Sequence, residues 1–178
     1  MVYTTRYESP VGRLLLAERD GKLAGVWMEG QKYFPGPMEE AREDPGSPLL
    51  RRAAEWLDRY FAGERPAPEE LPLAPEGSEF RQEVWRLLLE IPYGQTAAYG
   101  ELAHRLAARR GLTRMSAQAV GGAVGHNPIS IIIPCHRTVG SGGSLTGYAG
   151  GLQKKLWLLA HEGVDTNRFF VPQKGTAL

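Results

Sequence analysis

Short alternating runs of apolar and polar residues fill the first part of the chain and predict β-strands. The runs cover residues 2–7, 13–17 and 22–28. The pair Asp20-Gly21 favours a tight hairpin between the second and third runs, because both residues tolerate the positive φ angles of such a turn. Residues 29–47 are rich in glycine, proline and glutamate and are expected to form a surface loop.

A helix is predicted directly after this loop. Ser47 is a suitable N-cap and Pro48 suits the first helical position. The apolar residues that follow share one helical face. Residues 64–77 are dense in proline and glutamate, so they are the best candidate for a linker between two domains, residues 1–75 and 76–178.

The second half of the chain is predicted to be mainly helical. Apolar spacing indicates helices over residues 78–91, 96–107, 116–124 and 152–162. The second and third of these are short, are joined by a tight connection and suggest a helix-turn-helix, although small residues also suit ordinary helix packing. The β-branched run over 129–133 predicts a buried strand that leads into Pro134-Cys135-His136-Arg137.

The composition is typical of a soluble globular protein of 178 residues, 42% of them hydrophobic and 23% charged. No apolar run approaches the roughly 20 residues that span a bilayer, and the N-terminus lacks the features of a signal peptide. We therefore expect no membrane association and a cytoplasmic location, or a nuclear one in a eukaryote. A single cysteine excludes an internal disulfide and a multi-cysteine zinc site, so no metal is expected.

The distribution of charge is more informative than the net charge of +1. Residues 102–161 contain no acidic residue and seven basic ones, which leaves 14 basic against 20 acidic residues elsewhere. Such a segment is typical of a phosphate-binding surface, although the pattern also arises by chance on a solvated face. The basic residues are Arg105, Arg109, Arg110, Arg114, Arg137, Lys154 and Lys155.

Cys135 is the only cysteine in the chain. A lone cysteine is usually a small core residue. Here it precedes His136 and Arg137; nearby positive charge favours a thiolate, and a histidine can remove the thiol proton. Adjacent residues of an extended strand point to opposite faces, so direct contact between Cys135 and His136 requires a bend. The pattern indicates an activated nucleophile and identifies no substrate.

The residues around Cys135 resemble the active-site segment of the O6-alkylguanine-DNA alkyltransferases, or methylated-DNA–protein-cysteine methyltransferases. The similarity rests on NPISIIIPCHRTVGSGGSLTGYAGG followed by LLAHEG, and it extends back through AVGGAVGHNP and IPYGQTAAYGELA. It implies an α+β protein with a small ribonuclease-H-like α/β domain and a C-terminal winged-helix (helix-turn-helix) domain. It also implies irreversible, single-turnover transfer of an alkyl group from O6-alkylguanine in double-stranded DNA to Cys135, by a monomer without a cofactor.

The same resemblance implies roles for other residues. His136 would act as a base through a water, Glu162 would orient its imidazole, and Asn127 would stabilise the turn before the active-site strand. Tyr99 would rotate the target nucleotide out of the duplex, and Tyr148 would close the pocket near the guanine O6. The remaining pocket contacts, and DNA contacts from a helix in the minor groove, would come from Ser116, Ala117, Gln118, Gly121, Arg137, Thr138 and Ala149.

One position departs from the family pattern, and three alternative functions stay open. Many members present an arginine that fills the gap left by the flipped base; here the residue is Gln118, which can still hydrogen-bond the orphaned base. The alternatives are a non-catalytic sensor of alkyl damage, a winged-helix regulator with a structural cysteine, and a thiol hydrolase. Cys135 argues against the sensor, because sensors of that kind lack the acceptor, and the regulator leaves the Cys-His context unused.

Overall fold

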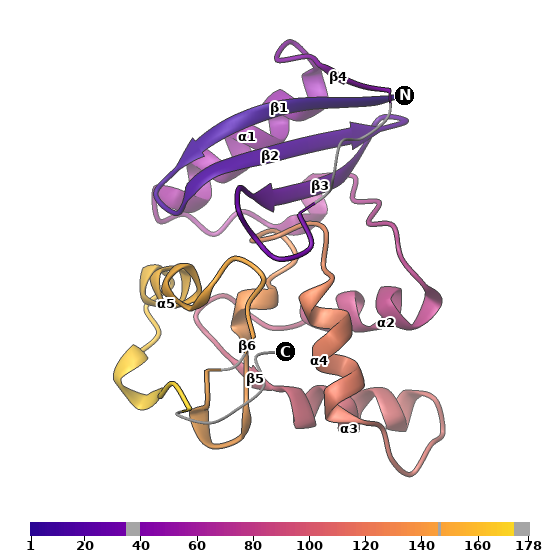
Figure 1. The fold of residues 1–178 in the computed structure, drawn as a ribbon, viewed down its shortest axis with the longest axis vertical. Coiled ribbons are helices and arrows are strands. Elements are labelled where there is room, and N and C mark those ends of the chain that lie inside the picture. Colours follow the sequence, from indigo (N-terminus) through magenta and orange to yellow (C-terminus); the bar gives the residue numbers. More distant parts are fainter. Residues whose placement is uncertain (35–39, 146, 173–178) are drawn as a thin grey trace. The chain divides into compact units, whose positions relative to one another are not determined.

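The computed structural model describes residues 1–34, 40–145 and 147–172. Its contacts divide the chain into two compact units. The first consists of Met1–Glu76 with Pro128–Ile132, and the second of Gly77–Asn127 with Ile133–Leu178. The α+β class predicted from the sequence is confirmed, with a sheet in the first unit and mainly helices in the second (Figure 1).

A four-stranded sheet with the order β3-β2-β1-β4 forms the base of the first unit. Its strands are β1 (Val2–Ser9), β2 (Gly12–Arg19), β3 (Lys22–Met28) and β4 (Ala41–Glu43). The first three pair antiparallel, and Asp20 and Gly21 both take positive φ in the turn between β2 and β3, as predicted. The sequence analysis missed β4, because its three residues become a strand only through parallel pairing with β1.

The helix α1 (Pro48–Phe61) covers one face of this sheet (Figure 1). Its N-terminus is capped as the sequence predicts: the Ser47 hydroxyl accepts a hydrogen bond from the Leu50 amide at 3.3 Å. Trp56 and Leu57 lie on the buried side of the helix. The core of this unit therefore lies between the sheet and α1, where the apolar faces of both are removed from water.

Four helices make up most of the second unit, and their bounds are α2 (Glu79–Leu88), α3 (Tyr99–Arg109), α4 (Ala117–Gly125) and α5 (Leu152–His161). The helices α3 and α4 pack together and both contact α2, which is the helix-turn-helix arrangement predicted for this region. Two short strands, β5 (Ala97–Ala98) and β6 (Thr138–Val139), pair in parallel. This pairing brings the start of α3 beside the segment that follows Cys135. No helix in the described residues is long and apolar enough to cross a membrane.

The buried strand predicted over residues 129–133 is wrong. Ile129 forms a single parallel bridge with Val26 of β3, and the chain then turns at Ile131, whose φ is 71°. The side chains are buried as predicted, but a run that is buried on every side does not by itself distinguish a strand from a turn. Two backbone hydrogen bonds join this segment to Val26 at the edge of β3. They hold the chain directly before Ile131 and so maintain a φ angle that is unfavourable for a β-branched residue.

Candidate active site

Cys135 begins a short 3₁₀ helix, Cys135–Arg137, whose three residues are all buried. The Cys135 amide donates to the Ile133 carbonyl at 2.8 Å, and the Thr138 hydroxyl donates to the Cys135 carbonyl at 2.7 Å. These bonds fix the backbone on both sides of the thiol. The turn supplies the bend that the sequence analysis required between Cys135 and His136.

Asn127 is buried where α4 ends and connects this turn to the thiol. Its Nδ2 donates to the Ile133 carbonyl at 2.9 Å, six residues further along the chain. Its side chain also hydrogen-bonds the Cys135 thiol. Asn127 therefore contacts both the backbone before the thiol and the thiol itself.

The thiol of Cys135 lies in an environment with opposing effects on its ionisation. Burial raises the pKa of Cys135, because it removes water from the thiolate. The Asn127 hydrogen bond, the charge of Lys155 and two backbone amides lower the pKa. Burial is the larger effect, so the resting group is a thiol that needs a base before it can react.

Glu162 accepts hydrogen bonds on both of its carboxylate oxygens. Oε2 accepts from Nε2 of His136 at 2.5 Å, and Oε1 accepts from Nε of Arg137 at 2.7 Å and from the Gly94 amide at 3.1 Å. A further guanidinium nitrogen of Arg137 donates to the Ile91 carbonyl at 2.7 Å. Burial alone raises the pKa of Glu162, but His136 and Arg137 outweigh it and hold the pKa well below its usual range. The carboxylate is therefore ionised.

His136 is completely buried, and burial lowers its pKa against the opposing effect of Glu162. The ring is therefore neutral at rest. Because Glu162 accepts the proton on Nε2, the lone pair of the neutral ring lies on Nδ1. Nδ1 is buried and has no hydrogen-bond partner among the described residues. A neutral imidazole with a free lone pair can accept a proton.

Two tyrosines lie close enough to Cys135 for its charge to affect them. The Tyr99 hydroxyl donates to the Gly147 carbonyl at 3.2 Å. Burial, reinforced by the charge of Cys135, raises the pKa of Tyr99 to about 12. Burial also raises the pKa of Tyr148 well above its usual value, with contributions from the charges of Cys135 and Glu162. Both hydroxyls therefore keep their protons at neutral pH and can donate hydrogen bonds.

Lys155 is a site residue that the sequence analysis missed, because it was counted there only as a basic residue. It lies on α5 with no exposed surface, and its ammonium lies 5.9 Å from the centre of the Tyr99 ring. Burial lowers the pKa of Lys155 to about 8, while the charge of Cys135 opposes this. The signal was its spacing, since Lys155 stands three and four residues before the buried pair Leu158 and Leu159 and so shares their face.

The exposed face of α4 near its N-terminus consists of small side chains and Gln118. Ser116 caps the helix by accepting a hydrogen bond from the Ala119 amide at 3.2 Å. Ser116, Ala117 and Gln118 are exposed, whereas Gly121 is buried on the packed side of the helix. Where the side chains are as small as Ser116 and Ala117, the helix backbone can approach another surface closely.

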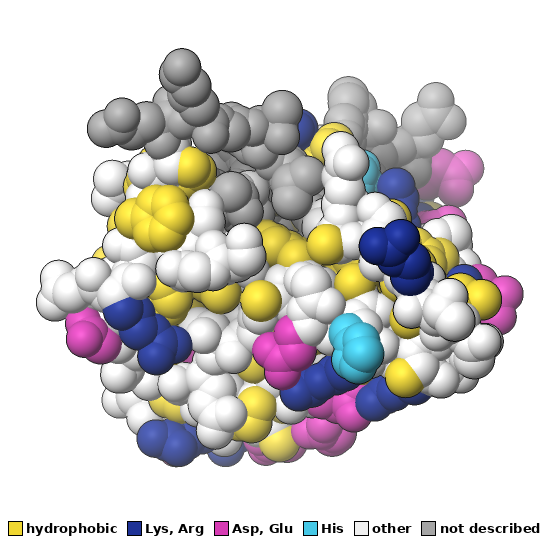
Figure 2. Space-filling model, turned by 90° about the horizontal axis from the view of Figure 1, so that it is seen from below, with side chains coloured by type: hydrophobic (Ala, Val, Ile, Leu, Met, Phe, Trp, Pro, Cys, Tyr) yellow, Lys and Arg dark blue, Asp and Glu magenta, His cyan; other side chains and the backbone are white. Residues whose placement is uncertain are grey.

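Most of the seven basic residues between positions 102 and 161 are not available to phosphates in this structure. Four of them pair with carboxylates: Arg105 with Glu101, Arg109 with Glu90, Arg110 with Glu83 and Arg137 with Glu162. Lys155 is buried. Figure 2 shows basic side chains interspersed with acidic and apolar ones on the face in view. The charge argument for a phosphate-binding surface therefore rests on Arg114 and Lys154.

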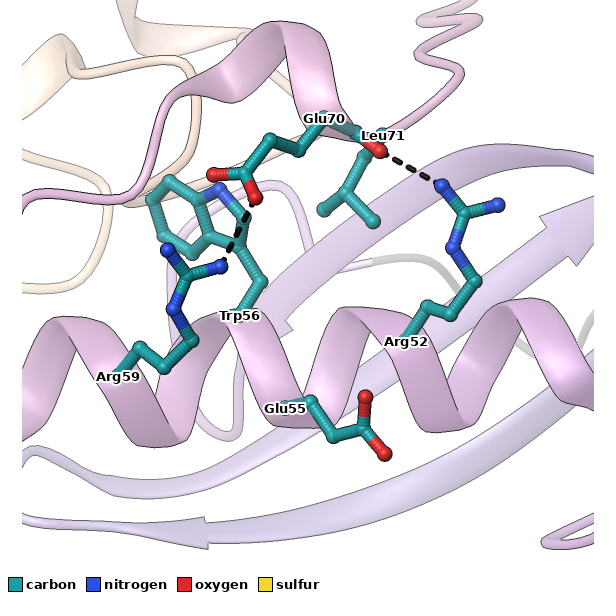
Figure 3. Close-up of a pocket in the computed structure, with 6 residues that line it drawn as sticks. All are labelled: Arg52, Glu55, Trp56, Arg59, Glu70 and Leu71. Atoms are coloured by element: carbon teal, nitrogen blue, oxygen red, sulfur yellow. Dashed lines mark hydrogen bonds and ion pairs between the residues drawn. The ribbon is translucent and has the colours of Figure 1, made fainter.

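A pocket on the first unit contains none of the predicted site residues. It is lined by Arg52, Glu55, Trp56, Arg59, Glu70 and Leu71 (Figure 3). Arg52 donates to the Glu70 carbonyl at 2.7 Å and Arg59 pairs with the Glu70 carboxylate at 2.9 Å. These bonds fasten the proline-rich segment predicted as a linker to α1, so we assign the pocket a structural role. Among the described residues, no group of three metal-ligating side chains lies together.

Two family models match the chain. The ribonuclease-like domain of 6-O-methylguanine DNA methyltransferase matches residues 1–75. The DNA-binding domain of the same family matches residues 79–164.

Individual relatives match over most of their length. A methylated-DNA–protein-cysteine methyltransferase of Haemophilus influenzae is 42% identical over 161 residues, which cover 90% of this chain and 86% of the relative. One of Mycolicibacterium paratuberculosis is 45% identical over 165 residues, covering 91% and 93%. The crystal structure of Mycobacterium tuberculosis OGT in complex with DNA superimposes with a TM-score of 0.80 at 41% identity, covering 94% of each chain.

Proposed function

This chain belongs to the 6-O-methylguanine DNA methyltransferase family, and we propose that it repairs DNA directly by moving the alkyl group of O6-alkylguanine to Cys135. The observation that carries the proposal is the buried thiol next in the chain to a neutral histidine whose Nδ1 lone pair is free. A structural cysteine needs neither this histidine nor the carboxylate that orients it.

The first step is removal of the thiol proton. His136 takes it on Nδ1 through one water, while Glu162 holds the opposite side of the ring. Glu162 also stabilises the imidazolium that results. Arg137 is a positioning residue in this scheme, since its guanidinium fixes both carboxylate oxygens of Glu162. The thiolate is stabilised by the Asn127 hydrogen bond and by the Lys155 ammonium.

The second step is displacement at the alkyl carbon. The bond between sulfur and carbon forms as the bond between carbon and O6 breaks, and the electron pair goes to the guanine. A hydrogen bond from the protonated hydroxyl of Tyr148 stabilises the leaving base. The proton that His136 took is returned when guanine regains its N1 proton, so atoms and charge balance.

The product explains why the reaction stops after one turnover. A thioether on Cys135 has no ready hydrolytic route, and the structure describes no second cysteine that could accept the group, because the chain holds only one. Each chain is therefore consumed by one lesion. All the residues invoked lie in one chain, so a monomer is sufficient.

DNA must present the alkylated base outside the stack, because the O6-alkyl carbon is not accessible to a buried thiol within the duplex. We propose that α4 enters the minor groove with its exposed small side chains Ser116 and Ala117. Tyr99 then turns the nucleotide toward the pocket, which backbone groups of Thr138 and Ala149 help to line. Gln118 hydrogen-bonds the base left without a partner.

An intact-mass measurement tests the proposal. The protein is incubated with duplex DNA that contains O6-methylguanine, and we expect a gain of one methylene unit that saturates at one per chain and maps to Cys135. The control Cys135→Ser should gain nothing and still bind the DNA. Tight binding without a mass gain in the native protein would indicate a sensor or regulator, and repeated release of product would indicate a hydrolase.

A further inference from the structure

The segment Arg168–Phe170, which we call the strap, pairs with the loop between β6 and α5. The structure describes residues 140–145 and 147–151 of this loop. Phe170 forms a parallel bridge with Ser144. Its carbonyl accepts from the Leu145 amide at 2.7 Å, and its amide donates to the Gly143 carbonyl at 3.1 Å. The yellow C-terminal segment runs beside this loop in Figure 1. These bonds engage the backbone on both sides of Ser144.

Gly143 allows the strap to approach the loop closely. A Cβ at this position would lie 2.8 Å from the carbonyl oxygen of Arg168, and the φ of Gly143 is +88°. Only glycine meets both conditions without displacing the strap. The neighbouring Gly142 has a similar φ of +68°, yet a Cβ there would meet nothing within 4 Å. The contact is therefore specific to Gly143.

The strap is also fixed to the segment before β5. Arg168 donates to the Thr96 hydroxyl at 3.0 Å, and its guanidinium lies 4.9 Å from the centre of the Phe169 ring. Thr96 directly precedes β5, which pairs with the residues that follow the Cys135 turn. The strap thus connects the loop to the strand pair that supports the thiol.

The loop held by the strap carries part of the candidate site. It includes Tyr148, which is half-buried, and its Gly147 carbonyl accepts a hydrogen bond from the Tyr99 hydroxyl. The loop is rich in glycine, and glycine loses more backbone entropy on ordering than any other residue. Ordering such a loop requires contacts from outside it, and the strap supplies backbone hydrogen bonds of this kind.

We propose that the strap is a positioning element for alkyl transfer, holding the loop so that Tyr148 faces the thiol of Cys135. The inference rests on the proposed function, because positioning Tyr148 against the thiol serves that reaction. It predicts that loosening the strap slows transfer within the bound complex and leaves DNA affinity unchanged. None of the strap contacts named above, all between described residues, involves α4.

The test compares Gly143→Ala with Gly142→Ala as its matched control. Both add one methyl group at a positive φ in the same turn, and only the first displaces the strap. We expect Gly143→Ala to slow single-turnover transfer at saturating DNA at least tenfold, with the dissociation constant for DNA within twofold. The Leu145 amide should lose protection from hydrogen exchange. Gly142→Ala should match the native protein in all three measurements.

Shortened chains give an independent comparison. A chain that ends after Asn167 removes the strap, and one that ends after Pro172 keeps it. The first should reproduce the Gly143→Ala result and the second should behave as the native protein. The proposal would be overturned if the two members of each pair, the two glycine variants or the two shortened chains, transferred alkyl groups at equal rates. It would also be overturned if the transfer rate and the affinity for DNA fell together. If the native protein accepts no alkyl group, the proposed function fails, and Leu145 exchange still decides whether the strap orders the loop.

Discussion

The environment of Lys155 in the fold differs from the one that the sequence suggests. In the sequence it is one of two adjacent lysines in a basic segment. In the fold it is fully buried beside Tyr99, where its charge acts on the Cys135 thiol. A buried ammonium costs stability, so its presence is consistent with a role in stabilising a thiolate.

Lys155→Met is expected to separate stability from reactivity. The ordinary pKa of lysine, 10.5, applies to the unfolded chain, whereas burial lowers the pKa of Lys155 to about 8 in the fold. The unfolded chain holds the proton more tightly, so burial of the ammonium costs ~3 kcal/mol below pH 8, and this cost disappears as the pH rises toward 10.5.

The variant should therefore have the higher free energy of unfolding at pH 7, an advantage that shrinks above about pH 8, and should transfer alkyl groups about tenfold more slowly or worse. Urea unfolding at several pH values and single-turnover kinetics measure the two effects. Lys154→Met is the matched control, because this neighbouring side chain is only half-buried. A variant that is less stable than the native protein at pH 7 would show that the ammonium is well satisfied.

Among the secondary-structure elements, features set by neighbouring residues were predicted correctly, whereas features set by distant residues were not. Ser47 and Ser116 cap their helices as predicted, because the cap, the first turn and the hydrogen bond lie within four residues. For residues 129–133 the prediction of a strand was wrong. Their geometry is set by Val26, about a hundred residues earlier, which no local pattern contains.

The exposed face of α4 gives a prediction about DNA binding. Gln118→Arg adds a cation and stacking surface to the face that we propose enters the minor groove, so duplex DNA should bind several-fold more tightly. Fluorescence anisotropy with a labelled duplex measures this. Gln153→Arg, on the exposed side of α5, adds the same charge to another helix of the same unit and should have a smaller effect. Equal gains from both variants would mean that charge alone is responsible.

Across the whole molecule, the surface charge is more balanced than its sequence suggests. The acid-free segment folds so that its arginines meet glutamates from other parts of the chain, such as Glu83 and Glu90. Exposed ion pairs add little stability, but they neutralise charges that would otherwise attract phosphates. Arg114 is exposed, and none of the ion pairs among the described residues includes it.

The salt dependence of DNA binding should reflect this balance. Each phosphate contact contributes a slope of about −0.9 to the plot of log affinity against log salt concentration. Arg114→Ala should therefore reduce the slope by about one. The charge-neutral double variant Arg109→Ala/Glu90→Ala should leave the slope unchanged, because it removes a pair that already neutralises itself. A flattened slope in the double variant would indicate that the pair opens on DNA.

The sequence by itself determined the features that are local in the chain: the three antiparallel strands and the hairpin of the first unit, the helix caps, and the Cys-His-Arg motif with its family resemblance. It also brought Asn127 and Glu162 into the same hypothesis as Cys135, through that resemblance. Only the tertiary structure decided which charges are buried, which are paired and where the chain turns. These depend on partners far apart in the sequence, such as Lys155 beside Tyr99 and Phe170 beside Ser144, and burial and pairing are properties of the assembled fold.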